Sequence, residues 1–513
     1  MAIDRRSLLR IGAVAAAASV TAGVGGSSAA PALAHGRGPR GGNKWDQLRR
    51  HVHGDVVLPG DPTYEQAIQL QVAEYDRIRP AAVLYCESEH DVRTGILFAQ
   101  DHGLHAVARS GGHSNAGYST TEGLVIDVSR RKKVLAGPTT TKIETGLQAV
   151  DVLDALAHRG IALPNGTCPT VSVAGFVTGG GTGPFSRKYG VASDRIRAAR
   201  VVLADGRTVV CDERQRSDLL WALRGGGGGN FGIITQYTLD QVPITRMCQY
   251  RLVWHWNDTV RLITGLQEWI ADLPEEIAAD LLVIAPATPG TAPLVQLVGT
   301  SLGSLETLDA ELDRLVGLTG RQPTERTAVD LPYRDAMMRV WSCSDKTVEQ
   351  CHRTGTTPEG TLPRDAFRLT RSRLVDDPIP ETGVEDILAA FENGHAAGQV
   401  RVMSLRVMGG QVNALAPRDT AFFHRTAAFN LSFSFGLTST DASEEEKQTV
   451  LGHLHDGFDV FDAYSNGHTL QNFTDPYLEN WRDAYYGDNR RRLSQVKKKY
   501  DPHGFFTFEQ SVS

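Results

Sequence analysis

Two short stretches carry side chains that could form covalent bonds to a bound group. The first is Arg109-Ser110-Gly111-Gly112-His113-Ser114, and the second is Gly166-Thr167-Cys168-Pro169-Thr170-Val171. Neutral imidazole and thiolate are both nucleophiles, and the thiolate is the reactive form of cysteine. Neighbouring glycines let the backbone approach a planar ring and leave N–H groups free for a pyrophosphate. The pair predicts attachment of a flat, phosphorylated cofactor. The alternative is that His113 and Cys168 are an ordinary turn histidine and a buried thiol.

The second stretch runs on into Gly179-Gly180-Gly181-Thr182-Gly183. Together the stretches resemble the flavin oxidases of the berberine-bridge-enzyme-like family, in which one FAD is bound covalently through a histidine and a cysteine. The resemblance is weak over residues 246–460, the half expected to bind substrate. It implies bicovalent FAD on His113 and Cys168. Elsewhere it is carried by residues 79–83, 123–127, 201–206, 218–224, 230–235, 485–489, 497, 500–502, 505 and 510–511.

The resemblance also implies the other cofactor contacts. A residue no larger than valine at position 173, near where the family controls access to the flavin, leaves room for O2 and favours an oxidase. No metal ligand set is expected. Besides His113 and Cys168, the expected contacts are Arg109, Ser110, Gly111, Gly112, Ser114, Gly117, Val173, Gly175, Gly179, Gly180, Gly181, Gly183, Gly232, Ile233, Asn472, Tyr485 and Asn489.

The usual catalytic phenols of this family are missing. In relatives that oxidise alcohols, a tyrosine near the flavin commonly helps to remove the hydroxyl proton, within a Tyr-X-Asn-(Tyr or Phe) motif. Here that motif reads Leu470-Gln471-Asn472-Phe473, and a second habitual aromatic position is Thr182. Leucine accepts no proton, and threonine is a poor base at neutral pH. Three explanations stay open: a different base, a substrate that needs no strong base, or a flavin retained without turnover.

Two residues are candidates for the catalytic role that the missing phenols leave open. Arg406, in the strand-like stretch 401–408, could hold a carboxylate or phenolate or depress a neighbouring pKa. Tyr118, beside the His113 stretch, is the second. The alternatives are an arginine paired on a sheet face and a tyrosine that packs on the flavin or its loop. Candidate substrate contacts are Ser404, Asn430 and Ser432.

The length and composition of the chain limit the classes of protein to which it can belong. The 513 residues exceed one compact core, so we expect more than one domain. With 41% hydrophobic and 22% charged residues, the chain has the composition of a soluble globular protein. The formal net charge of −6 gives no reason to expect a nucleic-acid partner. Near the C-terminus, the basic triplets 490–492 and 497–499 are interpreted as a solvated helix face.

The N-terminus is typical of a twin-arginine export signal. Arg5-Arg6 precede an Ala/Gly-rich apolar stretch, and Ala32-Leu33-Ala34 offers a small-residue cleavage site. The apolar run is too short for a membrane anchor. We therefore expect a secreted or extracytoplasmic protein that acquires FAD before export, since this route carries folded proteins.

The pattern of short β-branched runs, Ala-rich helical stretches and glycine turns predicts an α+β fold. The expected architecture is a two-subdomain PCMH-type FAD-binding domain plus a substrate domain of antiparallel sheet backed by helices. Residues 430–435 alternate polar and apolar side chains, as one such strand would. The expected divisions are 1–34 (signal), 35–78 (leader and start of the FAD domain), 79–246 (FAD-binding), 247–460 (substrate-binding) and 461–513 (a segment returning to the FAD domain).

Six cysteines are too few for a disulfide framework. Cys343 and Cys351 are close in sequence in an exported protein, so a bridge between them is plausible. Cys86, Cys211 and Cys248 lie in apolar, strand-like runs and are expected to be buried free thiols.

The first hypothesis for function is a secreted, bicovalently flavinylated oxidase, acting as a monomer or homodimer. It would take a hydride from a bulky small molecule and pass the electrons to O2 to give H2O2. The substrate would be a natural product or phenolic, which the missing phenols favour, or an oligosaccharide. The alternatives are a flavin-loaded protein of low turnover and an oxidative cyclase. A P-loop at residues 225–229 is excluded, because no Gly-Lys-Ser/Thr follows.

Overall fold

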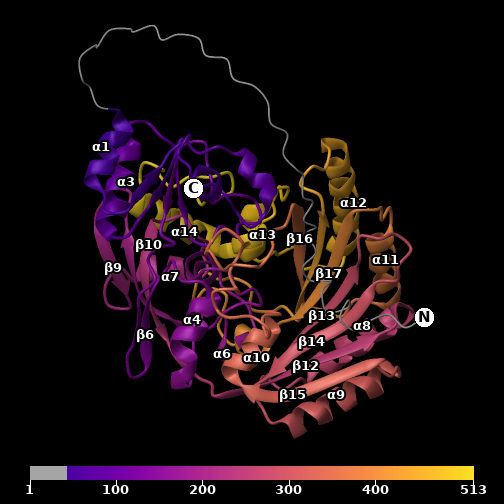
Figure 1. Cartoon of the computed structure of the whole chain (residues 1–513). Coiled ribbons are helices and arrows are strands. Elements are labelled where there is room, and N and C mark those ends of the chain that lie inside the picture. The colour runs from indigo at the N-terminus through magenta and orange to yellow at the C-terminus, as the bar shows by residue number, and fades with distance from the viewer. Residues whose placement is uncertain (1–42) are drawn as a thin grey trace.

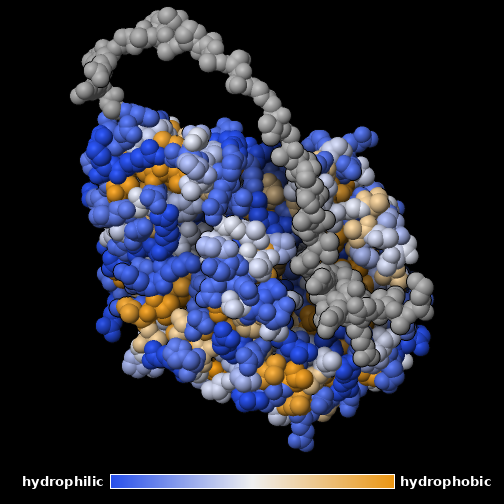
Figure 2. All heavy atoms as spheres, viewed as in Figure 1, coloured by the Kyte–Doolittle hydropathy of each residue, from blue (hydrophilic) through white to orange (hydrophobic). Residues whose placement is uncertain are grey.

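The computed structural model describes residues 43–513 (Figure 1). The predicted export signal, residues 1–34, lies outside the described residues. In the part that is described, no helix is both long and apolar enough to cross a membrane. The face shown in Figure 2 is mostly hydrophilic.

The first sheet is small and mainly parallel. β1 (Asp55–Val57), β2 (Ala82–Tyr85), β4 (Leu124–Asp127) and β3 (Ala106–Arg109) lie in the order β1-β2-β4-β3, with only β1 antiparallel. Helices α1 (Lys44–His51) and α3 (Glu89–Asp101) pack on it. Ser88 fixes the start of α3 with a capping box, in which its side chain accepts a hydrogen bond from the Asp91 N–H at 3.1 Å. The Cys86 thiol is buried in this core, as predicted.

The second sheet is antiparallel, in the order β5-β6-β10-β8-β9. Its strands are β5 (Val134–Ala136), β6 (Thr140–Glu144), β8 (Ile196–Val202), β9 (Thr208–Asp212) and β10 (Ile233–Asp240). The accompanying short elements are α4 (Ala149–Leu156), α5 (Val173–Thr178), α6 (Ser186–Tyr189), α7 (Ser217–Leu223) and the two-strand pair β7 (Ile161–Ala162) and β11 (Val242–Pro243). The short helix α2 (Tyr64–Ala67) packs on the first sheet. Cys211 is a buried free thiol on β9.

The third sheet has seven antiparallel strands in the order β15-β12-β14-β13-β17-β18-β16. One face packs under helices, as the strict alternation of buried and half-buried residues along β13 and β17 requires. On β18, Phe433 and Phe435 reach the helix side and contact Phe391. The strands are β12 (Arg246–Trp254), β13 (Ile277–Ala285), β14 (Leu294–Ser301), β15 (Glu325–Pro332), β16 (Phe367–Val375), β17 (Gln399–Val407) and β18 (Phe429–Leu437). The helices are α8 (Thr259–Ala271), α9 (Leu305–Thr319), α10 (Tyr333–Val340), α11 (Glu381–Glu392) and α12 (Glu444–Asp462).

This arrangement confirms the predicted α+β class and the antiparallel sheet backed by helices. Figure 1 shows the large sheet with α8, α9, α11 and α12 on its outer side, and the two smaller sheets on the other side of the molecule. The predicted Cys343–Cys351 bridge is present. Cys248, on β12, is free and buried.

The C-terminal helices α13 (Trp481–Tyr486) and α14 (Arg490–Tyr500) lie against the first half of the chain. Lys497 is the anchor, because its ammonium donates to the carbonyl of Asn230 at 2.7 Å and to Asp501 at 2.7 Å. The interpretation of both basic triplets as a solvated face was therefore wrong for Lys497, which is 4% exposed. The other five basic residues are exposed. The sequence period does not reveal which lysine meets a buried carboxylate.

We expect Lys497→Met to destabilise the chain strongly. It leaves the Asp501 carboxylate buried without its counter-ion, and breaking such a pair costs about 3–5 kcal/mol. The measurement is urea unfolding of the full chain, with Lys498→Met, at an exposed neighbouring position, as the matched control. Equal unfolding midpoints for the two variants would show that this pair does not anchor the C-terminal segment.

Candidate functional site

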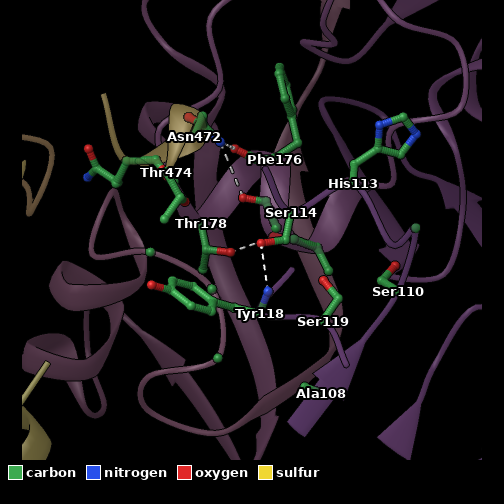
Figure 3. Close-up of a pocket in the computed structure, with 18 of the residues that line it drawn as sticks. Ala108, Ser110, His113, Ser114, Tyr118, Ser119, Phe176, Thr178, Asn472 and Thr474 are labelled. Atoms are coloured by element: carbon green, nitrogen blue, oxygen red, sulfur yellow. Dashed lines mark hydrogen bonds between the residues drawn. The ribbon is translucent and has the colours of Figure 1, made fainter. Parts of the chain in front are cut away.

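A cavity of about 490 Å³ brings together segments from across the chain. Its wall includes β3 and the loop after it, the Cys168 loop, the start of β10, and residues 471–474 and 506–508 near the C-terminus. Arg368 on β16 and Arg406 on β17 contribute from the large sheet. Figure 3 shows His113, Phe176 and Asn472 entering this region from different elements.

The His113 loop follows directly from the end of β3. Arg109, the last residue of β3, is buried and forms an ion pair with Asp127 at the end of β4, which fixes the start of the loop. Gly112 has a φ of 68°, a conformation that favours glycine. Within the described part of the chain, the N–H groups of Gly111, Gly112 and His113 donate to no other group. Successive free N–H groups in such a turn form a site for an anion such as a pyrophosphate.

The Cys168 loop is held by the helix α4 and by a tryptophan. The N–H groups of Ala149 and Val150 donate to the carbonyls of Val171 and Pro169, both at 3.0 Å. The Trp341 indole donates to the carbonyl of Gly166 at 3.1 Å. The loop is therefore fixed at both ends before any ligand binds.

The two loops touch because Gly111 has no side chain. A Cβ at Gly111 would lie 2.7 Å from the Ser172 Oγ and 3.0 Å from its backbone nitrogen. That spacing is shorter than packed atoms allow. The glycine thus permits the close approach that brings His113 and Cys168 to the same wall of the cavity.

One hydroxyl contacts both predicted attachment residues. The Oγ1 of Thr170 lies 2.8 Å from the Nε2 of His113 and 3.4 Å from the Sγ of Cys168. Burial, reinforced by the positive charges of Arg353 and Arg368, lowers the pKa of His113 to about 3. The imidazole is therefore neutral at physiological pH and keeps a nucleophilic lone pair.

The glycine turn after α5 is held by the C-terminal segment. The Asn472 Oδ1 accepts from the Gly181 N–H at 2.9 Å, and its Nδ2 donates to the Phe176 carbonyl at 3.1 Å. Gly179 reaches the cavity wall. Gly180, Gly181 and Gly183 do not, and serve instead to let Phe422, Phe176 and the Asn165 backbone pack closely.

Most of the other predicted cofactor residues line the cavity, whereas Gly117, Val173 and Asn489 do not. Those that line the cavity are Arg109, Ser110, Gly111, Gly112, His113, Ser114, Cys168, Gly175, Gly179, Gly232, Ile233, Asn472 and Tyr485. Gly117 packs on Tyr75, and Asn489 donates to the carbonyls of Pro417 and Thr420. Val173 begins α5 and points away from the cavity, whereas Val171 lines it.

Both candidate catalytic residues line the cavity, and each already contacts a carboxylate of the protein. Arg406 pairs with Asp280 at 2.9 Å and reaches the Thr167 hydroxyl at 3.3 Å, next to Cys168. Tyr118 lies against Phe508 with its hydroxyl 3.5 Å from Glu509. Burial, with the Glu509 charge, raises the pKa of Tyr118 well above its usual range. Tyr118 is therefore a hydrogen-bond donor rather than a base at neutral pH.

Of the two positions that lack the habitual phenol, only one faces the cavity. Thr182 lines the wall. Leu470 is 0% exposed and packs with Val191, Leu374 and Phe422. The residues that follow it, Gln471, Asn472 and Phe473, are the ones that line the cavity.

The predicted substrate residues lie on the inner face of the large sheet, behind the wall. Ser404 and Ser432 are paired across β17 and β18, and Ser372 on β16 continues the row. Ser404 donates to Asp280 at 2.5 Å and so supports the carboxylate that holds Arg406. Asn430 is the cross-strand neighbour of Arg406 and is 2% exposed. None of these side chains lines the cavity.

Several residues of the site, in the cavity wall or directly behind it, were not found from the sequence. Arg368 shares the inner face of β16 with polar residues, so its position two residues before Thr370 was a usable signal. Thr170 stands inside the quoted Cys168 stretch, but nothing in the sequence indicates that it meets His113. Gln71 and Phe508 lie far from either motif and carry no such signal.

The unpaired hydrogen-bonding groups that line this cavity fit FAD. Four wall residues carry buried polar atoms without a partner among the described residues, an unfavourable state unless a polar ligand pairs with them. These are Gln71 Oε1, Arg109 Nη1, Ser172 Oγ and Gln471 Oε1. Combined with the free N–H groups after β3, this pattern matches a ligand that has both a phosphate and a polar ring system.

Comparison with known proteins supports the same assignment. The FAD binding domain family matches residues 80–212, and the family described as berberine and berberine like matches residues 471–513. A Bacillus subtilis protein named "Uncharacterized FAD-linked oxidoreductase YgaK" is 27% identical over 471 residues, covering 90% of this chain and 96% of its own. The tetrahydroberberine oxidase of Berberis wilsoniae is 26% identical and covers 85% of each chain.

The fold agrees with a solved structure as well. BBE-like 1 of Physcomitrella patens superposes with a TM-score of 0.81 at 24% identity, covering 92% of this chain and 99% of that one. Both matching families contribute to one cavity wall, at the His113 loop and at residues 471–474. The chain belongs to the berberine-bridge-enzyme-like FAD-linked oxidoreductases.

Proposed function

We propose that this oxidoreductase is an exported oxidase whose FAD is attached to both His113 and Cys168. The observation that carries the proposal is that both nucleophiles meet one hydroxyl, that of Thr170, at the FAD cavity. When bound, FAD would accept a hydride equivalent from the substrate and pass two electrons to O2, giving H2O2. The loop after β3 would hold the pyrophosphate, and the Cys168 loop would hold the benzenoid edge of the ring.

The charge of the wall supports a particular substrate class. Among the described residues that line the cavity there is no aspartate or glutamate, while Arg109, Arg368 and Arg406 supply three guanidinium groups. Tyr118 holds its proton at neutral pH. A wall that offers donors but no strong base suits a substrate that is already acidic or electron-rich, such as a phenol. The substrate that we propose is therefore a bulky phenolic or related natural product.

Arg406 would bind the phenolate oxygen or an equivalent anionic group. Asp280 and Ser404 fix its guanidinium, so little side-chain freedom is lost when a ligand binds. Because Asp280 offsets the charge of Arg406 in the free protein, the contribution to substrate binding is one of directed hydrogen bonds rather than of net charge.

The attachment can be tested by removing each nucleophile. We expect His113→Ala and Cys168→Ala each to retain covalent FAD through the other residue, and the double variant to release all of its FAD. The measurement is the visible absorbance of acid-precipitated protein together with its intact mass. Complete release of flavin from either single variant would rule out two independent bonds.

The substrate class can be tested by stopped-flow reduction of the flavin. We expect fast bleaching with a para-hydroxylated benzylic alcohol and slow bleaching with cello-oligosaccharides, whose hydroxyl protons are hard to remove. Arg406→Met should slow reduction by the phenol about tenfold, equivalent to ~1.4 kcal/mol of barrier. Arg418→Met, at an exposed ion pair on the surface, is the control.

Two outcomes of that experiment would contradict the assignment. Rapid reduction by the sugars would mean that the protein has a base other than Tyr118. Absence of bleaching by any member of a broad panel of phenolics and sugars would favour the low-turnover alternative.

Export can be tested at the N-terminus. We expect Arg5→Lys with Arg6→Lys to trap folded, flavin-loaded protein in the cytoplasm, because a twin-arginine signal requires both arginines. The measurement is the distribution of FAD-bearing protein between cytoplasmic and exported fractions of the host. Unchanged secretion of the double variant would refute this route.

A further inference from the structure

We infer that Thr170 is a positioning residue for covalent attachment, and that its hydroxyl prepares His113 and Cys168 together. The inference rests on the proposed bicovalent FAD. Its basis is a geometry that neither sequence motif reveals: the Oγ1 of Thr170 lies 2.8 Å from the His113 Nε2 and 3.4 Å from the Cys168 Sγ. Thr170 is 3% exposed, so bulk water does not compete for these contacts.

A hydroxyl has one donor and two acceptor sites, so it can serve both neighbours at once. The neutral His113 ring has a single N–H. If that N–H is on Nε2 and donates to Thr170, the lone pair at Nδ1 is left free to attack. The Thr170 O–H then donates to the Cys168 sulfur and orients it. This arrangement pairs the Nε2–H, the Thr170 hydroxyl and the Cys168 sulfur, and it leaves the imidazole nucleophilic at Nδ1.

The surrounding loop holds Thr170 in the position that this hydrogen-bond arrangement requires. It lies in the loop that the N–H groups of Ala149 and Val150 fix through the carbonyls of Val171 and Pro169. The His113 loop is brought against the same segment at Gly111 and Ser172. Neither imidazole nor thiol depends on the cofactor for its contact with the hydroxyl.

The chemistry of attachment gives this hydroxyl a second task. In each attachment, a lone pair of nitrogen or sulfur forms a bond to a carbon at the benzenoid edge of oxidised FAD, and a C–H bond of that edge breaks with loss of a proton. The two electrons stay on the ring until O2 takes them, leaving as H2O2. Each nucleophile also gives up its own proton to water, the imidazole from Nε2 and the thiol from sulfur. The Thr170 oxygen accepts the hydrogen bond of the Nε2–H until that proton leaves, and so holds the ring in place without acting as the base.

The test uses full-length apoprotein from a riboflavin-starved host, mixed with FAD in air. Attachment is followed by mapping FAD-bearing peptides that contain His113 or Cys168. We expect Thr170→Val, which removes the hydroxyl, to lower the limiting rate of both attachments by at least about tenfold, equivalent to ~1.4 kcal/mol of barrier. Thr170→Ser keeps the hydroxyl and should attach FAD within about threefold of the native rate.

Two measurements separate this role from a structural one. The FAD concentration that gives half the limiting rate should be the same in native, Thr170→Val and Thr170→Ser proteins, because non-covalent binding uses the loop after β3. Thr170→Val should also slow the remaining attachment in His113→Ala and in Cys168→Ala backgrounds, since each residue contacts the hydroxyl separately.

The inference would be overturned by native attachment rates in Thr170→Val, by a Thr170→Ser variant as slow as Thr170→Val, or by a change confined to the half-saturating FAD concentration. A failure of the proposed function looks different: the native protein itself would then carry no covalent FAD, whatever residue stands at position 170.

Discussion

The contact between the His113 loop and the Cys168 loop is the constraint on which the rest of the site depends. It exists because Gly111 has no Cβ to collide with Ser172. The two loops come from different parts of the fold: one leaves the parallel sheet at β3, and the other is held by α4 and Trp341. If the loops were further apart, the Thr170 hydroxyl could not contact both His113 and Cys168. The buried Arg109–Asp127 pair and the Asn472 bridge hold the surrounding elements around that contact.

The large sheet contributes to the same site from the opposite side. Its helix-covered face is largely apolar and supplies the packing, although the buried Arg371, Arg373 and Arg401 also lie on it. Its inner face carries a row of serines and the Asn430–Arg406–Asp280 row. Only the ends of long side chains, those of Arg368 and Arg406, reach the cavity from this face. The sheet therefore positions the guanidinium groups of Arg368 and Arg406 at the cavity. Most of the other polar residues on its inner face contact one another.

Much of the site could be predicted because reactive residues in glycine-rich turns are a local signal. His113, Cys168 and Asn472 stand in short motifs, and the chain brings each to the cavity.

Predictions that depended on the direction in which a side chain points were less accurate. Val173 is two residues from Val171, but it starts a helix, and the change of backbone turns its side chain into the core. The alternation at residues 430–435 correctly indicates which side chains share a face, yet a period of two says nothing of what covers that face. Long-range partners such as Thr170 for His113 and Asp501 with Asn230 for Lys497 are set by tertiary packing, which no single stretch encodes.

The central claim is that one FAD bridges the two loops through both nucleophiles. The most direct measurement is peptide mapping by mass spectrometry of denatured, proteolysed native protein. The account predicts a single cross-linked species in which one FAD joins the peptide containing His113 to the peptide containing Cys168. Recovery of both peptides unmodified, with all FAD in the soluble fraction after denaturation, would contradict it.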